Sequence, residues 1–272
     1  DTSHAIAFTQ TLNQGPKNPA DKQRFEGFRV VAAYPQGSKD IESSTKRVPE
    51  YTEKIKGLDV EIVDSIETLL PKVDAVLLES NDGRVHLDQI RPVLRARKPV
   101  FIDKPVAASL EEAVRIYAEA EKANVPIFSS SSLRYGQSTQ DARKGSFGEI
   151  QSAETFSPVN VEPTHSELFW YGIHGCESLF TVMGTGCLSV QRSIDPEGKI
   201  TVKGTWKNSR SGVFRQENGK DRKGYGGTAN TAKGPIAIGK YEGYDPLLLA
   251  VVDFFRTGRP PVSAEETLEI YA

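Results

Sequence analysis

Two charged residues, Asp103 and Lys104, follow directly after an apolar run in this sequence. Val100–Ile102 has the length and composition of a buried strand, and Pro105 fixes the backbone after the lysine. An ammonium group at the end of a strand can orient a substrate hydroxyl, lower its pKa and polarise a developing carbonyl. A surface salt bridge between the two residues is the alternative. We expect Lys104 to be catalytic and Asp103 to contact a cofactor.

A polar turn follows another predicted strand, Ala75–Leu78, and leads into a helix. Ligands of open α/β sheets bind beyond the carboxyl ends of the strands. We therefore expect Ser80, Asn81 and His86 to lie where a nicotinamide ribose binds. A plain solvated turn, relaxed by Gly83, is the alternative.

Thr2, Ser3 and His4 precede an amphipathic run, Ala5–Leu12. The N–H groups at a helix N-terminus bind anions, and the two hydroxyls could donate to a pyrophosphate. A plain N-cap without a ligand is the alternative. The sequence has no Gly-x-Gly-x-x-Gly motif here, and we expect the domain to lack its first strand, which would precede Asp1.

Tyr34, Ser38 and Lys39 follow the predicted strand Arg29–Ala33. A dinucleotide-binding domain usually has an acidic residue here that binds the adenosine ribose. Ser38 and Lys39 could instead accept the 2′-phosphate of NADP, whereas a solvated turn is the alternative. The sequence leaves NAD and NADP open as cofactors.

The segments between residues 28 and 128 alternate short β-branched runs with amphipathic helical stretches. This alternation is typical of βαβ units around a parallel sheet. The clearest helix is Ser109–Ala123, where Ser109 and Glu112 form a capping box. The predicted strands are Arg29–Ala33, Val60–Val63, Ala75–Leu78, Val100–Ile102 and Pro126–Phe128.

Beyond Arg134 the strand-like segments become longer, which predicts a largely antiparallel sheet. Asn208–Pro235 is rich in Gly, Lys and Asn, and we expect it to form an exposed loop or hairpin. A helix is expected from about Ser263, and we expect it to be cut short at its C-terminal end. The predicted strands are Ile150–Phe156, Leu188–Ile194, Ile200–Trp206 and Ile236–Tyr241, with turns at Pro196-Glu197-Gly198 and Asn218-Gly219.

Composition narrows the classes of function. The chain has 272 residues and a formal charge of -2, which is enough for two domains and a poor match to nucleic acid or an anionic membrane surface. Its apolar runs are far shorter than the roughly 20 residues of a membrane-spanning helix. Cys176 and Cys187 are too few for a disulfide framework and lack the spacing of a zinc site, so we expect no metal and a cytoplasmic protein. We also expect residues upstream of Asp1.

Residues 103–113 resemble the Glu-Lys-Pro strand end and following helix of the Gfo/Idh/MocA oxidoreductases, the group of glucose-fructose oxidoreductase and inositol dehydrogenase. Residues 81–86 are similar to the Pro-Asn-x-x-His turn of that family. Residues 147–150 resemble its entry into the second domain, and residues 260–266 resemble the start of its C-terminal helix. The resemblance covers essentially the whole chain.

This resemblance implies the fold class α/β, with two domains. Residues 1–130 would form a Rossmann-type doubly wound parallel sheet that binds the dinucleotide. Residues 131–272 would form a substrate and oligomerisation domain of the α+β type. Its large, mostly antiparallel open sheet serves the family as an oligomer interface, so the resemblance implies a homo-oligomer, either a dimer or a tetramer.

The resemblance also implies NAD(P)-dependent hydride transfer between nicotinamide and a secondary hydroxyl or ketone of a sugar, inositol or related polyol. Lys104 matches the family lysine that orients the hydroxyl, and His174 matches the histidine that acts as general acid and base. The family has an aspartate four residues before that histidine, where this chain has Trp170. Glu177 lies one helical turn beyond His174 and could partly compensate for the missing carboxylate.

Further substrate contacts are expected from the same region. Trp170 could offer a stacking surface to a sugar-like ring, and Tyr171 and Glu177 flank the histidine. Arg134 and Tyr135 could contact substrate or cofactor, although an interdomain ion pair is the alternative for the arginine. A catalytically silent dinucleotide- or sugar-binding homologue is the alternative function, and a purely structural oligomer is a third.

Overall fold

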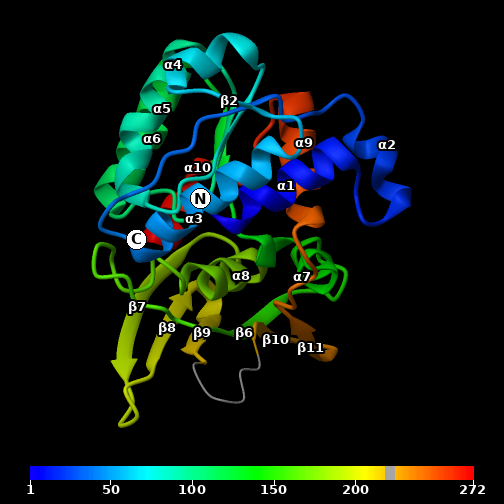
Figure 1. The fold of residues 1–272 in the computed structure, drawn as a ribbon. Helices are drawn as coiled ribbons and strands as arrows, with labels where there is room; N and C mark the ends of the chain where they lie inside the picture. The colour runs from blue at the N-terminus through cyan, green and yellow to red at the C-terminus, as the bar shows by residue number, and fades with distance from the viewer. Residues whose placement is uncertain (218–223) are drawn as a thin grey trace. The chain divides into compact units, whose positions relative to one another are not determined.

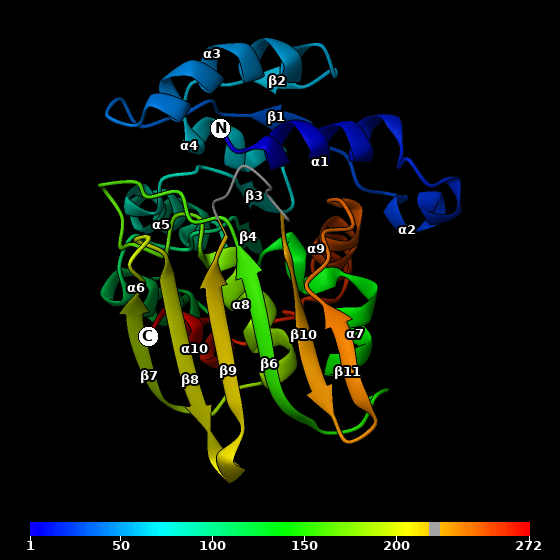
Figure 2. The same cartoon turned by 90° about the horizontal axis from the view of Figure 1, so that it is seen from below.

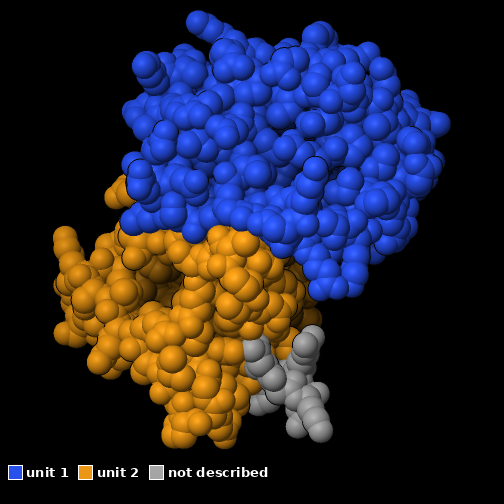
Figure 3. All heavy atoms as spheres, turned by 60° about the vertical axis from the view of Figure 1, so that its left-hand side comes forward, with its two compact units in different colours: residues 1–129, 247–263 blue, residues 130–246, 264–272 orange. Residues whose placement is uncertain are grey.

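The computed structural model describes residues 1–217 and 224–272, and Figure 1 shows the order of the elements. The chain divides into two compact units, coloured separately in Figure 3. The first unit comprises residues 1–129 and 247–263, and the second comprises residues 130–246 and 264–272. The chain therefore passes from the first unit to the second at residue 130, returns at 247 and leaves again at 264.

Parallel strands separated by helices build the first unit, as the sequence predicts. β3 pairs with β4, and β4 pairs with β5, all in parallel. β1 pairs with β2, also in parallel. Its helices and strands are α1 (Ser3–Gln14), α2 (Lys22–Phe25), β1 (Ala32–Ala33), α3 (Glu42–Lys56), β2 (Glu61–Ile62), α4 (Ile66–Leu69), β3 (Val76–Leu78), α5 (His86–Arg95), β4 (Val100–Ile102), α6 (Leu110–Ala123), β5 (Ile127–Ser129) and α9 (Asp245–Thr257).

An apolar cavity of about 460 Å³ lies in the first unit. Its lining includes Val30–Ala33 around β1 and Val76–Leu78 of β3, together with residues of α1 and α9. The two parallel sheets are not hydrogen-bonded to each other within the described residues of this unit.

The predicted strand Arg29–Ala33 is observed only as Ala32–Ala33. The carboxamide of Asn13 replaces the missing ladder, because its Nδ2 donates to Val30 O at 2.9 Å and its Oδ1 accepts from Val30 N at 2.9 Å. A side chain thus satisfies a backbone segment that the hydrophobic pattern assigns to a strand.

The helix predicted from Ser109 is confirmed as α6. Ser109 is its N-cap, and its hydroxyl accepts from the Glu112 N–H at 3.2 Å. Asn124 ends the helix in the left-handed conformation, with a φ of 53°.

A row of phenylalanine rings explains why residues 247–263 return to the first unit. Phe101 of β4 packs on Phe128 of β5 with ring centroids 5.1 Å apart, and Phe128 packs edge-on against Phe254 of α9 at 4.9 Å. Leu247, Leu248 and Val251 of α9 are fully buried. The predicted division at residue 130 therefore differs from the structure in its second range, because α9 covers the parallel sheet.

The second unit contains a six-stranded sheet in the order β11-β10-β6-β9-β8-β7, seen face-on in Figure 2. Its neighbouring strands are antiparallel except for the parallel pair β6 and β9, so the sheet is mixed. Its elements are α7 (Gln137–Arg143), β6 (Ile150–Ser157), α8 (Ile173–Met183), β7 (Cys187–Ile194), β8 (Ile200–Trp206), β9 (Ser211–Gln216), β10 (Gly226–Thr231), β11 (Gly234–Ile238) and α10 (Ala264–Tyr271). The fold class predicted from the sequence is confirmed.

The predicted loop over Asn208–Pro235 is wrong for most of its described part, which supplies β9 and β10, whereas the hairpin alternative holds for β10 and β11, which pair antiparallel with Thr231 opposite Gly234. The glycines that suggested a loop allow close strand pairing, since a Cβ on Gly227 would lie 2.3 Å from the carbonyl oxygen of Glu154 on β6. Phe214 of β9 is buried in the core of the unit. The predicted turn at Asn218-Gly219 lies outside the described residues.

Of the other two predictions in this sheet, the turn is confirmed and the strand is shorter than predicted. The turn at Pro196-Glu197-Gly198 joins β7 to β8, where Gly198 N donates to Asp195 O at 2.9 Å. The predicted strand Ile236–Tyr241 ends earlier, at Ile238, because Gly239 has a φ of 70° and turns the chain away. No helix in the described ranges is long and apolar enough to cross a membrane.

Candidate functional site

The carboxyl ends of β3 and β4 bring the first group of predicted residues together. Asp103 follows β4 directly, and its N–H donates to Leu78 O of β3 at 2.8 Å. The next peptide bond, between Lys104 and Pro105, is cis. Ligands of open parallel sheets bind at this edge, and Lys104 lies beside it.

Asp103 is bound by residues from the start of α1. The imidazole Nδ1 of His4 lies 2.8 Å from Asp103 Oδ2, and both side chains are buried. Burial alone would raise the pKa of Asp103, but His4 and Lys104 outweigh it and hold the pKa well below its usual value. The structure thus joins two residues predicted separately to contact the cofactor.

Lys104 is partly buried beside this carboxylate. Its backbone N–H donates to Asp103 Oδ1 at 2.8 Å. Burial lowers the pKa of its ammonium group, and the nearby charge of Asp103 only partly opposes this effect. A lysine with a lowered pKa can exchange a proton more readily near neutral pH than an exposed one.

The turn between β3 and α5 packs its backbone against the loop after Lys104. A Cβ on Gly83 would lie 2.4 Å from the carbonyl carbon of Ala107, so only glycine fits there. The Nδ1 atom of His86 lies 3.1 Å from the carbonyl oxygen of Val106, and its Nε2 atom lies 2.9 Å from the carbonyl oxygen of Ser80. Burial lowers the pKa of His86. His86 therefore holds the two loops together.

The side chains of Ser80 and Asn81 differ in whether a hydrogen-bonding atom is left without a partner. The Ser80 hydroxyl donates to Gln89 Oε1 at 3.0 Å inside the unit. Asn81 donates from Nδ2 to Ser43 Oγ at 3.2 Å, while its buried Oδ1 has no hydrogen-bond partner among the described residues. The buried Oε1 of Glu79 likewise has none. Two unsatisfied acceptors thus lie at the carboxyl end of β3.

The start of α1 adjoins the same strand end. Thr2 is the N-cap, its side chain makes no capping hydrogen bond, and its N–H donates to Glu79 O at 3.2 Å. Ser3 begins the helix and is exposed. The Asp1 carboxylate accepts from the Asn81 N–H at 2.7 Å.

The turn after β1 carries more negative charge than the sequence suggested. The Ser38 hydroxyl donates to Asp82, and Arg84 binds both Asp82 and Asp40. Lys39 is exposed, and Tyr34 is partly buried. The Asp82 carboxylate that accepts from Ser38 disfavours a 2′-phosphate at this hydroxyl, because like charges repel, although Arg84 balances part of its charge.

His174 is the second residue of α8 in the second unit, where a close packing contact fixes the helix. A Cβ on the adjacent Gly175 would lie 2.4 Å from the ring of Phe214 on β9. His174 is buried, and its Nδ1 lies 2.7 Å from the hydroxyl of Ser131. Ser131 is fully buried and follows the last strand of the first unit by two residues.

Glu177 is committed to a buried ionic network rather than lying open to a ligand. Its carboxylate accepts from Ser130 Oγ at 2.5 Å, from Ser131 N at 2.7 Å and from Arg134 Nε at 2.7 Å. Arg134 also binds Glu266 at 2.7 Å. The guanidinium is almost fully buried, and both carboxylates raise its pKa against the effect of burial.

Arg134 was expected to contact substrate or cofactor, or to form an interdomain ion pair. Its observed partners, Glu177 and Glu266, both belong to its own unit. Tyr135 beside it has its pKa raised to about 12 by burial. These residues support the turn that carries Ser131.

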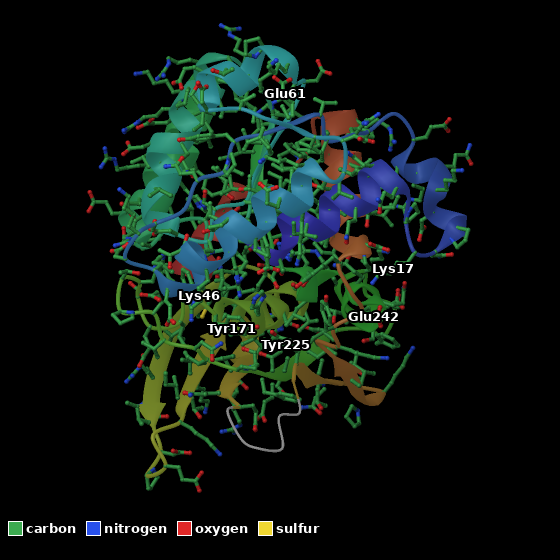
Figure 4. The ribbon with its side chains drawn as sticks, in the orientation of Figure 1. Lys17, Lys46, Glu61, Tyr171, Tyr225 and Glu242 are labelled. Atoms are coloured by element: carbon green, nitrogen blue, oxygen red, sulfur yellow. The ribbon has the colours of Figure 1, made fainter. Side chains whose placement is uncertain are left out.

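Tyrosine rings, rather than Trp170, surround the histidine. Tyr171 and Tyr225 lie edge-on to His174, with ring centroids 5.1 and 5.8 Å away. Their hydroxyls lie 2.7 Å apart, and Figure 4 shows the two side chains together. Trp170 packs against His165 at 4.8 Å.

Sequence reasoning missed Ser131 and Tyr225. Ser131 stands in a run of four serines, Ser129–Ser132, that carries no motif, and Tyr225 lies in the segment interpreted as a loop. A polar run directly after a predicted strand was the one available signal. Within the described ranges, no group of three or more His, Cys, Asp or Glu side chains could hold a metal ion.

Comparison with known proteins gives a family match for part of the chain. Residues 17–131 match the model of the GFO_IDH_MocA family, described as an oxidoreductase family with an NAD-binding Rossmann fold. A curated relative, 1,5-anhydro-D-fructose reductase of Ensifer adhaerens, is 32% identical over 107 residues. That match covers 37% of this chain and 32% of the relative, so the chain spans about a third of the relative's length.

Solved structures share the fold over nearly the whole chain. Myo-inositol dehydrogenase of Lactobacillus casei, in complex with NAD(H) and myo-inositol, has a TM-score of 0.73 at 18% identity and covers 99% of this chain and 89% of its own. Scyllo-inositol dehydrogenase of the same organism, with NAD(H) and scyllo-inositol, has a TM-score of 0.72 at 15% identity, with coverages of 98% and 90%.

Proposed function

Because residues 17–131 match the model of an oxidoreductase family with an NAD-binding Rossmann fold, we propose that this protein is an NAD-dependent dehydrogenase or reductase. Its substrate would be a secondary hydroxyl or ketone of a sugar, inositol or related polyol. The observation that carries the proposal is Lys104 at the carboxyl end of buried β4, beside a charged and buried Asp103.

The residues at this strand end fit a dinucleotide. Asn81 Oδ1 is a buried acceptor without a partner among the described residues, and Thr2 leaves the start of α1 without a side-chain cap. Asn81, Thr2, Ser3 and Lys104 are the groups that would hold the cofactor. When bound, NAD supplies the nicotinamide carbon that gives or takes the hydride.

We propose NAD rather than NADP. Ser38 is bound to Asp82, and Asp40 lies beside it on Arg84. Ribose hydroxyls can donate to carboxylates, whereas a 2′-phosphate would be repelled by them.

The aromatic surroundings of His174 support a polyol as substrate. Tyr171 and Tyr225 offer ring faces and hydroxyls beside the imidazole. Sugar-like rings need both an apolar surface and hydrogen-bonding partners. We propose Lys104 and His174 as the catalytic residues.

The first test is a fluorescence titration of the protein with NADH and NADPH, followed by a polyol panel monitored at the nicotinamide absorbance band. We expect tighter binding of NADH and turnover of at least one polyol. Lys104→Met should abolish turnover, whereas Lys122→Met on the exposed side of α6 should not. Failure to bind either cofactor would refute the proposal.

A catalytically silent binding protein is the second candidate, and Trp170 in place of the family aspartate favours it. Such a protein would bind NADH with wild-type affinity and show no absorbance change with any polyol. The same panel therefore separates the two.

We also propose a homo-oligomer in a reducing compartment such as the cytoplasm. β7 exposes three apolar side chains on one face, Leu188, Val190 and Ile194, at 62%, 60% and 54% exposure. Both cysteines are unpaired. Sedimentation of the wild type and of Val190→Lys tests the oligomer, since the charged variant should be smaller in solution.

A further inference from the structure

The hydrogen bond at Nδ1 of His174 determines what the imidazole can do at its other nitrogen. In neutral histidine one ring nitrogen carries the proton and the other accepts. A carboxylate near Nδ1 accepts a hydrogen bond from the Nδ1–H and leaves a lone pair on Nε2, which makes the ring a base. Here the partner of Nδ1 is the hydroxyl of Ser131, at 2.7 Å.

The surroundings of Ser131 fix the direction of that hydrogen bond. Its Oγ already accepts from the Leu133 N–H at 3.2 Å, as the N-cap of a short 3-10 helix. The hydroxyl has one proton to donate, and Ser131 is fully buried, so solvent does not accept it. Among the contacts of Ser131 in the described chain, His174 Nδ1 is the atom that can accept this proton.

We propose that Ser131 is a positioning residue that holds neutral His174 with its proton on Nε2. His174 would then act as a hydrogen-bond donor to the substrate oxygen rather than as the base that the family resemblance implies. This inference rests on the proposed function for its catalytic meaning, but the tautomer itself does not depend on turnover.

Protonation of His174 would disturb this arrangement. An imidazolium would donate from Nδ1 to Ser131 Oγ, and the hydroxyl proton would lose its acceptor. A buried donor without a partner is unfavourable, so the serine favours the neutral ring. The nearest acidic residue along α8, Glu177, has its charge balanced by Arg134.

Hydrogen bonds and an ion pair to Glu177 hold the turn that carries Ser131. Glu177 receives the Ser131 N–H at 2.7 Å and the Ser130 hydroxyl at 2.5 Å. Arg134, the residue after Leu133, donates from Nε to the Glu177 carboxylate at 2.7 Å. Ser131 is thus positioned by backbone and charge together.

The chemical consequence concerns the proton of the substrate oxygen. If His174 donates a hydrogen bond to the substrate oxygen, the proton of that oxygen must pass through another group. During reduction that group gives one proton to the oxygen, and during oxidation it takes the proton back.

The test is ¹⁵N NMR of the full protein with labelled histidine, in which the four histidines are assigned with the help of His174→Gln. We expect neutral His174 to carry its proton on Nε2 and Nδ1 to resonate as a hydrogen-bonded acceptor. In Ser131→Ala the Nδ1 resonance should move to the position of an unbonded nitrogen. Ser132→Ala, a buried neighbour in the same turn, is the matched control and should leave it unchanged.

A second variant reverses the predicted effect. Ser131→Asp should place the proton on Nδ1 and raise the pKa of His174. A wild-type protein with the proton on Nδ1, or a Ser131→Ala spectrum identical to that of the wild type, would overturn the inference. The wild-type spectrum decides the tautomer even where a variant does not fold. The expected spectrum without any turnover would instead count against the proposed function alone.

Discussion

The imidazole Nδ1 of His4 lies 2.8 Å from Asp103 Oδ2, across 99 residues of sequence. This contact ties the first turn of α1 to the loop that carries Lys104. His4 also stacks on Phe8 with the two rings 2° from parallel, and Phe8 is fully buried. The start of α1 and the end of β4 are therefore coupled by direct contacts, and we expect a change in either to alter the position of Lys104.

Asp103→Asn should remove a pH dependence of stability. The pKa of Asp103 is lowered in the folded state, so its contribution is present above the unfolded value of about 3.8 and is lost as the pH falls below it. Near neutral pH, breaking a buried pair should cost about 3–5 kcal/mol in the free energy of unfolding.

Urea unfolding from pH 3 to pH 7 measures this effect. The wild type should lose stability toward pH 3 more steeply than the variant. Asp88→Asn, at an exposed ion pair with Arg91, is the control and should keep the wild-type slope. Equal slopes for the wild type and Asp103→Asn would contradict the assignment.

Glu79→Gln should have the opposite signature. Burial and the nearby Asp103 raise the pKa of Glu79 to about 8, so the folded state favours the protonated acid. Its contribution is present below the unfolded value of about 4.5 and is lost as the pH rises through 8. The variant should match the wild type near pH 5 and exceed its stability at pH 9.

Thermal unfolding at pH 5 and pH 9 suffices for that comparison. Glu61→Gln on β2, an exposed position labelled in Figure 4, should show no such pH-dependent gain. If Glu79→Gln were equally destabilised at both pH values, Glu79 would be charged in the folded state.

Gly83→Ala should loosen the turn beside Lys104. Its Cβ would meet the backbone of Ala107 at 2.4 Å, and backbone cannot move aside as a side chain can. Overpacking of this kind costs about 1–3 kcal/mol and should weaken NADH binding. Gly57→Ala, where φ is -65° and the nearest contact is 3.3 Å, is the matched control, and equal losses in both variants would argue against a special role for Gly83.

Arg134→Met should destabilise the second unit strongly, because Glu177 and Glu266 would remain buried without their shared partner. The expected cost is about 3–5 kcal/mol. Arg192→Met removes an exposed pair with Glu167 and should change little. Chemical denaturation compares the two, and similar small losses would mean that the buried network is dispensable.

The sequence predicted those parts of the fold whose signals are local. Ser109 and Glu112 predict the start of α6, and the fully apolar run Val100–Ile102 predicts a strand buried on both faces. Lys104 could be found because it directly follows that run. Such signals depend only on neighbours along the chain.

The other features of the fold and the site depend on long-range packing, which local sequence patterns do not encode. α9 joins the first unit because Phe254 meets Phe128, a contact that no local pattern encodes. Gly226 and Gly227 allow close pairing with β6, although glycines in sequence favour a loop. Ser131 gained its role from a turn closed by Glu177, 46 residues away.

Transfer of deuterium from NADH that carries deuterium at both C4 positions to a panel of keto-polyols, followed by mass spectrometry, tests the central claim most directly. We predict one deuterium in the alcohol product, and a rate that falls by about 10²–10³-fold in His174→Ala while NADH binding is kept. His165→Ala is the matched histidine control. No deuterium in any product despite NADH binding, or an undiminished rate in His174→Ala, would contradict the account.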